Sequence, residues 1–471
     1  MGKLIVRIAS LLLIAAFLPT AVLAAEWNLE NGSIEITATA NAEGGTTQTV
    51  SQGGNSAEDS NPTITSNGKQ TSNTITIKAG ADTTANVTIK DTNINTGSAA
   101  IKTEGKGNVN LNVEGTNSAS SGDWHAGVEK SNGGKLTIGS ESGEGKLTAN
   151  GGEYGAGIGG GNRSGGSNIT ITGGEITANG GHGGAGIGGG NRSVGSNITI
   201  SGGKVTANGW KGSAGIGGGR YSSGSDITIS GGEVTANGGR YGAGIGGGSE
   251  GDGSVITISG GEVTAKGGTN GAGIGGGVRA SGRDITISGD SQVKAAGGAK
   301  DEYDGCGAAI GNGGNNTDTD KRVDGSEVEP DTSGLSPTGK VERIRGDGTV
   351  LDTIVGTVEP PKSASSEEPD KREPLYRVLN LDGSTLKHQA QKADGVLALT
   401  VSADGAILTG TLRALGYLQN QGIEKITFTD GTHTATIVLA DLIAKGEAEA
   451  VYVLTLGAAN TLTLNGEAID F

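Results

Sequence analysis

The 471-residue chain contains one cysteine, Cys306, and few aromatic residues, which make up 3% of the sequence. A single cysteine excludes an intramolecular disulfide framework, so the fold must be stabilised in another way. No histidine lies near Cys306 in the sequence, and we therefore interpret it as a small buried residue of a divergent repeat rather than a reactive nucleophile. The 8 prolines are too few for a collagen-like chain.

Basic residues are also scarce. Lys and Arg together number 35 against 50 Asp and Glu, which gives a net charge of −15. Because contacts with phosphate require clustered Lys and Arg, we expect no nucleic-acid partner. The histidines have no metal-ligand spacing, so we predict no metal and no other cofactor. These histidines are His125, His182, His388 and His433.

Long apolar runs are missing, with one exception at the N-terminus. Residues Ile8–Leu18 are apolar, Lys3 and Arg7 precede them, and small residues near Ala24 suit a cleavage site. This pattern is typical of a secretory signal peptide, which we assign to residues 1–24. The run is short for a membrane span. We therefore predict a secreted, extracellular chain with no membrane span in its mature form, free or associated with a cell surface.

Glycine is abundant, and its positions are periodic. The segment Gly155–Gly161, of sequence Gly-Ala-Gly-Ile-Gly-Gly-Gly, recurs around Ile187, Ile216, Ile245 and Ile274 at steps of 29 residues. A period of this length is typical of a stacked repeat. Each unit contains three short strand-like segments and cannot bury its own apolar residues, so the units must stack as coils of a solenoid. We therefore predict a mainly β protein, a right-handed parallel β-helix.

Alternation within the strands predicts which side chains enter the core. In the middle strand, Ile169 and Ile171 fall on one face, and Thr170 and Thr172 fall on the other. We expect internal ladders of isoleucine and external ladders of threonine. The position before this strand is polar in most repeats, which suits a turn whose backbone groups bind side chains. Its members are Asn168, Asn197, Asp226, Val255 and Asp284.

Composition divides the mature chain into four parts. Residues 25–59 are predicted as an N-terminal cap region, and residues 60–313 as the β-helix with degenerate terminal coils. Residues 314–371 contain many acidic, Pro and Ser residues and are predicted as a linker, with strands near 341–355. Residues 372–471 combine strand-like segments with segments of helical spacing, so we predict a small C-terminal α+β domain.

The repeats resemble a known family. Gly-Ile-Gly-Gly-Gly, and Ile-Thr-Ile-Ser-Gly-Gly at Ile227–Gly232, are similar to the repeats of secreted right-handed parallel β-helix proteins, the pectin-lyase-like group, from Gram-positive gut bacteria. The resemblance covers roughly residues 60–313 and is specific for architecture. It implies a β-helix, and it also points to carbohydrate binding because some members bind plant polysaccharide.

Two variable loops border the Gly-Ile strand of each repeat, and they contain a large share of the aromatic residues. Because the outward positions of that strand are glycines, we expect a trough with a glycine floor and walls formed by the loops. Aromatic rings can stack on sugars, and guanidinium groups can bind uronate carboxylates bidentately. We therefore predict binding of a polysaccharide, acidic or neutral. The predicted residues are Tyr154, Arg163, Arg192, Trp210, Tyr221, Arg240 and Tyr241.

Four alternatives remain open. The loops could be the solvated turns of a structural spacer, with glycine serving tight packing alone. The protein could also be an adhesin that binds a host or cell-surface protein. A pectate-lyase-like enzyme needs converging carboxylates and a base. Asp226 and Asp284 lie two coils apart with Val255 between them, so we predict no enzyme and no catalytic residues. Finally, the outward threonines could organise water as in ice-binding solenoids, although strands simply favour threonine.

Overall fold

The computed structural model describes residues 26–42, 44–317, 321–356, 375–382, 384–393, 395–420, 422–447 and 450–469. The chain divides into two compact units, one ending at Val358 and one beginning at Glu359. The predicted signal peptide and the end of the predicted linker, residues 357–371, lie outside the described residues. Within the described residues, no helix has the length and apolar character needed to cross a membrane.

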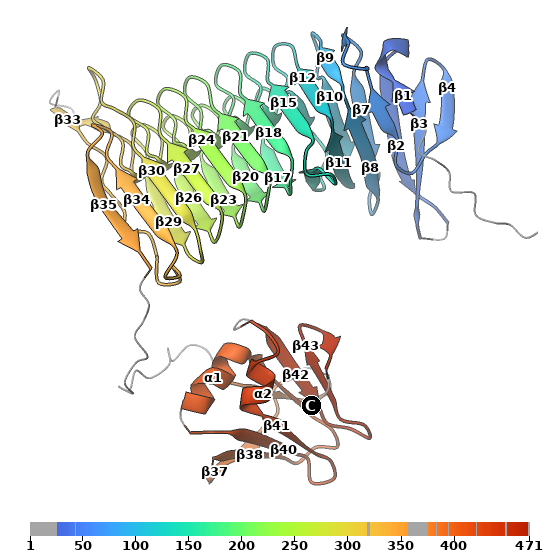
Figure 1. Ribbon diagram of the computed structural model, residues 1–471, viewed down its shortest axis with the longest axis vertical. Coiled ribbons are helices and arrows are strands. Elements are labelled where there is room, and N and C mark those ends of the chain that lie inside the picture. Colours follow the sequence, from blue (N-terminus) through green and yellow to red (C-terminus); the bar gives the residue numbers. More distant parts are fainter. Residues whose placement is uncertain are drawn as a thin grey trace, which may run out of the picture. The chain divides into compact units, whose positions relative to one another are not determined.

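The first unit is a parallel β-solenoid whose coils are stacked in one row (Figure 1). Each central coil contributes one strand to each of three long sheets, and neighbouring coils pair in register. For example, Ile187 of one coil pairs with Ile216 of the next. The predicted mainly β, parallel β-helix fold is therefore confirmed.

The three long sheets run along the solenoid, and each strand is hydrogen bonded to the next strand of its sheet. Sheet A consists of β1 (Glu26–Asn28), β5 (Thr63–Thr65), β8 (Thr84–Lys90), β11 (Asn108–Glu114), β14 (Leu136–Gly139), β17 (Gly166–Ile171), β20 (Gly195–Ile200), β23 (Gly224–Ile229), β26 (Gly253–Ile258) and β29 (Gly282–Ile287). Sheet B consists of β4 (Asn55–Glu58), β3 (Thr46–Gln52), β2 (Ile34–Ala40), β7 (Ile75–Ala79), β10 (Ile101–Gly105), β13 (Val128–Lys130), β16 (Ile158–Gly159), β19 (Ile187–Gly188), β22 (Ile216–Gly217), β25 (Ile245–Gly246), β28 (Ile274–Gly275) and β31 (Ile310–Gly311). Sheet C consists of β6 (Gln70–Thr71), β9 (Asn93–Asn95), β12 (Thr116–Ser120), β15 (Lys146–Asn150), β18 (Glu175–Asn179), β21 (Lys204–Asn208), β24 (Glu233–Asn237), β27 (Glu262–Lys266), β30 (Gln292–Ala296), β34 (Lys340–Ile344) and β35 (Val350–Val355).

Apolar ladders fill the interior of the solenoid. Burial of each isoleucine contributes about 1.5–3 kcal/mol, but only when a coil lies above and below it. One continuous core therefore runs from Leu29 to Val341. The isoleucines predicted to share one internal ladder are fully buried and in register; they are Ile158, Ile187, Ile216, Ile245 and Ile274.

The glycine that follows each of these isoleucines is required by the backbone. Gly188 has a φ of 130°, and a Cβ added there would lie 2.2 Å from the carbonyl oxygen of Gly217 in the next coil. Glycine adopts this conformation readily, whereas other residues do not. Close stacking of the coils is therefore sufficient to explain this glycine of the repeat.

The polar position predicted to precede the middle strand lies within that strand, because β17 begins at Gly166 and β20 begins at Gly195. Its backbone is in the left-handed region, and we call it the corner of the repeat. Asn168 and Asn197 have φ values of 58° and 50°, and Nδ2 of Asn197 donates a hydrogen bond to Oδ1 of Asn168. Asn and Asp tolerate this conformation better than most residues. Val255 has the same backbone with a φ of 53° and is 48% exposed, so a β-branched residue stands at a strained position.

The solenoid extends beyond the predicted bounds of 60 and 313. Strands β1 and β2 pair in parallel with β5 and β7, so the predicted cap region contains part of a coil. Strands β3 and β4 continue sheet B in antiparallel pairing. At the other end, β34 pairs in parallel with β30, and β35 returns antiparallel to β34. Residues 340–355 therefore belong to sheet C and not to a linker; they lack the glycine pattern that marks the repeats.

Short elements accompany the ends of the solenoid. A 3-10 helix follows β1 at Leu29–Asn31. Strands β32 (Asn315–Thr317) and β33 (Lys321–Val323) form an antiparallel pair after the last coil with a Gly-Ile strand. Cys306, in the same terminal region, is buried, and its burial raises the pKa of the thiol. The prediction of a buried cysteine is confirmed.

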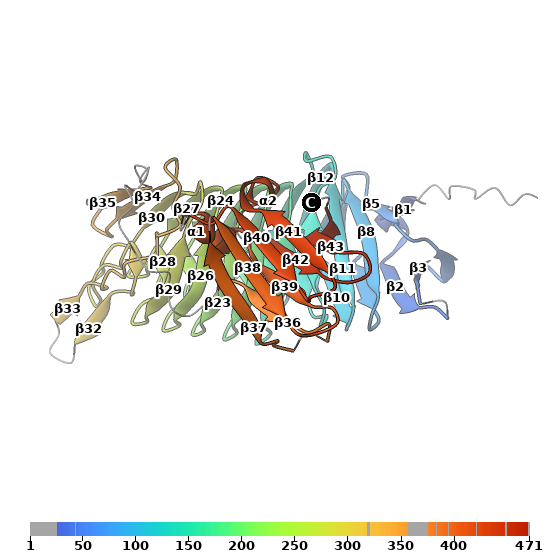
Figure 2. The same cartoon turned by 90° about the horizontal axis from the view of Figure 1, so that it is seen from below.

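The second unit contains two sheets and two helices around one core (Figure 2). Helix-like spacing at 409–419 and 436–445 corresponds to the helices α1 (Leu412–Asn420) and α2 (Leu439–Ile443). The predicted small C-terminal α+β domain is therefore present. One sheet consists of β36 (Arg377–Leu379), β39 (Ile407–Thr411), β42 (Val451–Thr455), β43 (Thr461–Leu464) and β44 (Glu467–Ala468). The other consists of β37 (His388–Ala393), β38 (Val396–Val401), β40 (Lys425–Thr429) and β41 (Thr434–Val438).

Candidate functional site

The glycine strand of each repeat is buried and does not form an open floor. Residues 155–161 are all buried. The chain turns sharply around Ile158, because the N–H of Ala156 donates to the carbonyl oxygen of Gly160 at 3.0 Å. The same bond recurs in the following coils. The predicted trough is therefore wrong: the glycines allow backbone segments to approach each other closely.

The two variable loops meet each other above this strand. The N–H of Asn191, in the loop after one Gly-Ile strand, donates at 2.9 Å to the carbonyl oxygen of Tyr154, in the loop before the preceding one. Arg220 and Gly183 form the equivalent bond at 2.8 Å. The loops therefore form one continuous structure, which we call the ridge. It comprises residues 152–155 and 161–164 and the equivalent residues of the other coils.

Aromatic and basic side chains project from left-handed backbone positions of the ridge. Tyr154 and Tyr241 have φ values of 73° and 78° in the first loop, and Arg163, Arg192 and Tyr221 have values of 57°, 59° and 62° in the second. Non-glycine residues are uncommon in this region and are held there by surrounding structure. Here the hydrogen bonds between coils hold them, so the repeat fixes the spacing of these side chains.

Five residues of the ridge lie on three adjacent coils near the middle of the solenoid, and backbone hydrogen bonds join these coils. We call them the central cluster: Tyr154, His182, Arg192, Arg220 and Tyr221. The guanidinium carbon of Arg220 lies 4.4 Å from the ring centroid of Tyr221, and that of Arg192 lies 5.9 Å from it. An Arg220 N–H donates to the Tyr221 hydroxyl. The rings of Tyr154 and His182 pack edge to face at 5.7 Å.

The arginines near the middle of the ridge differ from those at its C-terminal end in their ion pairs. Within the described residues, Arg163, Arg192 and Arg220 form no ion pair, whereas Arg240 and Arg279 do. A hydrogen bond to Glu153 raises the pKa of Tyr154, and the nearby charge of Arg220 acts in the opposite direction. The chain as a whole has an excess of acidic residues, so a group of arginines without ion pairs on adjacent coils is unusual for it.

At its C-terminal end the ridge is covered by a short acidic loop, residues 301–304. Oδ2 of Asp301 accepts hydrogen bonds from Arg240 and from the Tyr241 hydroxyl, each at 3.3 Å. Asp304 accepts two from Arg279, at 2.9 and 3.2 Å. Burial tends to raise the pKa of Asp301, but these bonds and two backbone N–H donors lower it overall. Arg240 and Tyr241 are thus already engaged.

The N-terminal end of the ridge also differs from the repeats. Glu129 and Lys130 stand where later coils have glycine. His125 Nδ1 hydrogen bonds to Glu129 at 2.8 Å, and Lys130 Nζ donates to the carbonyl oxygen of Asn132. Burial lowers the pKa of Lys130 to about 8. Each of these side chains thus has a partner within the chain, and Trp124, next to His125 in the sequence, is 61% exposed.

The structure brings some of the predicted residues together and separates others. Tyr154, Arg192 and Tyr221 belong to the central cluster, and Arg163 occupies the neighbouring position of the same ladder, because its N–H donates to Asn191. Trp210 is 60% exposed on the first loop of the ridge. Arg240 and Tyr241 bind Asp301 instead. The predicted set omitted Trp124, His182, Arg220 and Asp301. The first three fall in the variable loops of the repeats, so their positions could have revealed them, whereas Asp301 lies in an insertion outside the period.

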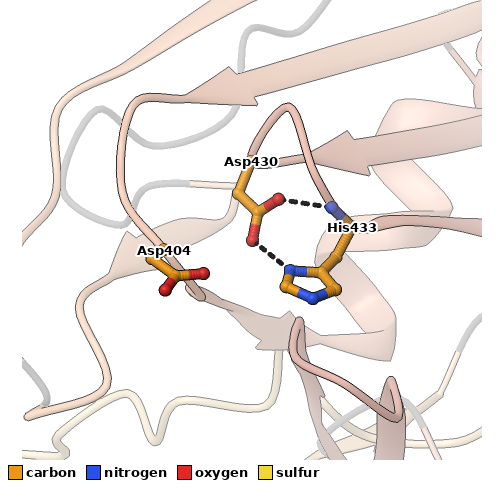
Figure 3. Close-up of side chains that lie close together, drawn as sticks. All are labelled: Asp404, Asp430 and His433. Atoms are coloured by element: carbon orange, nitrogen blue, oxygen red, sulfur yellow. Dashed lines mark hydrogen bonds and ion pairs between the residues drawn. The ribbon is translucent and has the colours of Figure 1, made fainter.

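One group in the C-terminal domain has the composition of a metal site. Asp404, Asp430 and His433 bring ligand atoms within 4.8 Å of one another (Figure 3). Asp430 already accepts hydrogen bonds from His433 Nδ1 and from the backbone N–H groups of Gly405, Thr432 and His433. These bonds occupy both carboxylate oxygens and lower the pKa of Asp430 strongly. The group therefore holds a hairpin turn to a neighbouring loop, and we assign it no metal.

Comparison with known proteins supports the fold. Six segments match a family model described as a beta helix repeat, at residues 142–162, 169–191, 198–220, 227–249, 256–278 and 285–314. No curated protein matches the chain, and no solved structure does either. The matched segments contain most of the ridge. The family model describes a repeat architecture and no activity.

Proposed function

We propose that this parallel β-helix protein is a secreted, non-enzymatic protein that binds polysaccharide through the ridge, at a cell surface or in an extracellular matrix. The observation that carries the proposal is the central cluster, where unpaired guanidinium groups surround an exposed tyrosine. Secretion rests on the signal-peptide pattern at residues 1–24.

The geometry of the ridge suits an extended polymer better than a compact ligand. Equivalent side chains recur at the coil spacing of about 4.8 Å, which is close to the length of one sugar unit. Stacking on each aromatic ring contributes about 0.5–1.5 kcal/mol, and an exposed ion pair contributes about 0–1 kcal/mol. One contact is therefore weak, and useful affinity requires several coils to bind one chain at once.

A glycan array with the mature chain, residues 25–471, tests the proposal. Replacing Trp210 and Tyr221 by Ala should weaken retention on the bound glycan and leave the melting temperature of the solenoid unchanged. Tyr417→Ala removes a comparably exposed aromatic ring from the C-terminal domain and serves as the matched control. Equal binding by the double variant and the parent would remove the ridge from consideration. Binding of a host protein but of no glycan would favour an adhesin instead.

A direct assay separates binding from catalysis. Among the described residues, Asp226 and Asp284 lie exposed at one corner of the solenoid with Val255 between them. Lyase chemistry needs converging carboxylates for a metal and a nearby base. Incubation with polygalacturonate and calcium should therefore yield no unsaturated product. Ultraviolet absorbance that grows in proportion to protein would establish a lyase.

A further inference from the structure

The acidic loop shows what the side chains of the ridge bind when a carboxylate is near. One oxygen of Asp301 accepts hydrogen bonds from a guanidinium group and a phenol that are neighbours in sequence, Arg240 and Tyr241. The guanidinium carbon of Arg240 lies 4.7 Å from the ring centroid of Tyr241. One coil further along, Arg279 donates one hydrogen bond to each carboxylate oxygen of Asp304. The chain thus supplies carboxylates to its own ridge.

The central cluster contains a similar pair in the second variable loop, and there the arginines are not paired with a carboxylate. Arg220 and Tyr221 are also neighbours in sequence, with the guanidinium 4.4 Å from the ring. The Tyr221 hydroxyl accepts a hydrogen bond from Arg220, so its own proton remains available for a ligand. Arg192 adds a second guanidinium from the preceding coil. Within the described residues, no acidic side chain pairs with Arg192 or Arg220, as Asp301 and Asp304 do at the end of the ridge.

We propose that the central cluster binds the carboxylates of a polyuronate, and that the acidic loop ends the binding surface because Asp301 and Asp304 occupy Arg240, Tyr241 and Arg279. This inference rests on the proposed function and specifies its ligand. Guanidinium groups bind carboxylates through two parallel hydrogen bonds. The spacing of the coils matches successive sugar units, so adjacent coils can bind successive carboxylates of one polymer.

The test compares polygalacturonate with the same polymer in fully methyl-esterified form, using affinity electrophoresis of the mature chain. Esterification removes the negative charge and keeps the sugar backbone. The parent protein should be retarded by the acid and much less by the ester, and salt should weaken the retardation because exposed ion pairs are screened. Equal retardation by both polymers would overturn the carboxylate assignment and leave polysaccharide binding standing. Retardation by neither polymer, together with a blank glycan array, would overturn the proposed function itself.

Two variants locate the site. Replacing Arg192 and Arg220 by Gln should weaken binding of polygalacturonate by roughly 10-fold. The control removes two exposed positive charges elsewhere on the solenoid, at Lys146 and Arg283, and should bind within roughly 2-fold of the parent. If both double variants lose the same affinity, binding depends only on net charge and the central cluster is not the site. Stronger binding of a sulfated polysaccharide than of polygalacturonate would also overturn the assignment.

The role of the acidic loop has its own test. Asp301→Asn removes the charge that Arg240 and Tyr241 bind. Its amide oxygen can still accept the backbone N–H groups of Tyr303 and Asp304, which bind Oδ1 of Asp301. The freed Arg240 and Tyr241 should lengthen the site and strengthen binding of polygalacturonate by roughly 2- to 5-fold. Unchanged or weaker binding by a variant that melts like the parent would show that the loop does not limit the site.

Discussion

The solenoid buries its isoleucines against the same residue type in the neighbouring coils, whereas the C-terminal domain buries unlike side chains from two sheets and two helices against one another. In the solenoid, Ile216 contacts Ile187 and Ile245 at one repeat on either side. In the C-terminal domain, the buried Phe428 of β40 pairs with the buried Ala435 of β41. The contacts between like residues in the solenoid can be predicted from the 29-residue period. The contacts between unlike residues in the C-terminal domain follow no period and cannot.

This difference also predicts how far the unfolding caused by a destabilising substitution should extend. Each coil contacts only its neighbours, so a lost coil weakens adjacent coils first and distant ones little. The C-terminal domain shares one core, so it should unfold as a single cooperative unit. Separate probes for the two units, such as hydrogen exchange followed by mass spectrometry, can therefore test the comparison.

The largest effect is expected from Ile216→Asp. The variant places an unpaired charge in the fully buried ladder of sheet B and should cost more than about 4 kcal/mol. Coils around residue 216 should lose hydrogen-exchange protection, and the C-terminal domain should keep its own. Ser201→Asp, an exposed change in the same coil region, is the control. An unchanged melting curve for Ile216→Asp would contradict the stacked core.

A cavity in the core of the C-terminal domain should destabilise that domain and leave the solenoid unchanged. Phe428 of β40 is fully buried in the C-terminal core, and Phe428→Ala should destabilise that domain by about 3–5 kcal/mol. Thermal unfolding should shift for the C-terminal transition alone. Tyr417→Ala, at an exposed position of α1, should stay within about 0.5 kcal/mol of the parent. A shift of the solenoid transition with Phe428→Ala would mean that the two units unfold together.

Acid should weaken the C-terminal domain through Asp430. Backbone N–H donors and His433 lower its folded pKa, so its stabilising contribution is fully present above the ordinary Asp pKa and is lost as the pH falls. Between about pH 5 and pH 2, the parent domain should lose more stability than Asp430→Asn does. Chemical denaturation across this range measures the difference. Asp441→Asn, at an exposed position of α2, should follow the parent curve.

The smallest effect concerns the strained corner of the repeat. Val255→Asn replaces a β-branched residue in the left-handed region by the residue found there in other coils, and should stabilise the solenoid by about 1 kcal/mol. Val194→Asn changes an exposed valine outside that region and should change stability by less than about 0.5 kcal/mol. Destabilisation by Val255→Asn would show that the corner prefers the valine side chain for a reason other than its backbone.

The candidate site illustrates the limits of the periodic pattern. Spacing placed Tyr154, Arg192 and Tyr221 in the same variable loops, and the structure brings them into one cluster with Arg220. Spacing also suggested that Arg240 and Tyr241 are available, yet both bind Asp301, which lies 60 residues later in an insertion that follows no period. The glycines between the loops suggested an open floor, but their absent side chains make room for backbone and not for a ligand.

The sequence by itself determined the stacked β-helix, its internal isoleucine ladder and the change of architecture before the C-terminal domain. Those features depend on local alternation and on a 29-residue period, both of which are visible in a single chain. Only the tertiary structure decided that the two loops join into a ridge, that residues 340–355 extend sheet C, and that the acidic loop engages one end of the ridge. These outcomes depend on hydrogen bonds and ion pairs between segments without a shared period, and the energy of such contacts depends on where the folded backbone places each group.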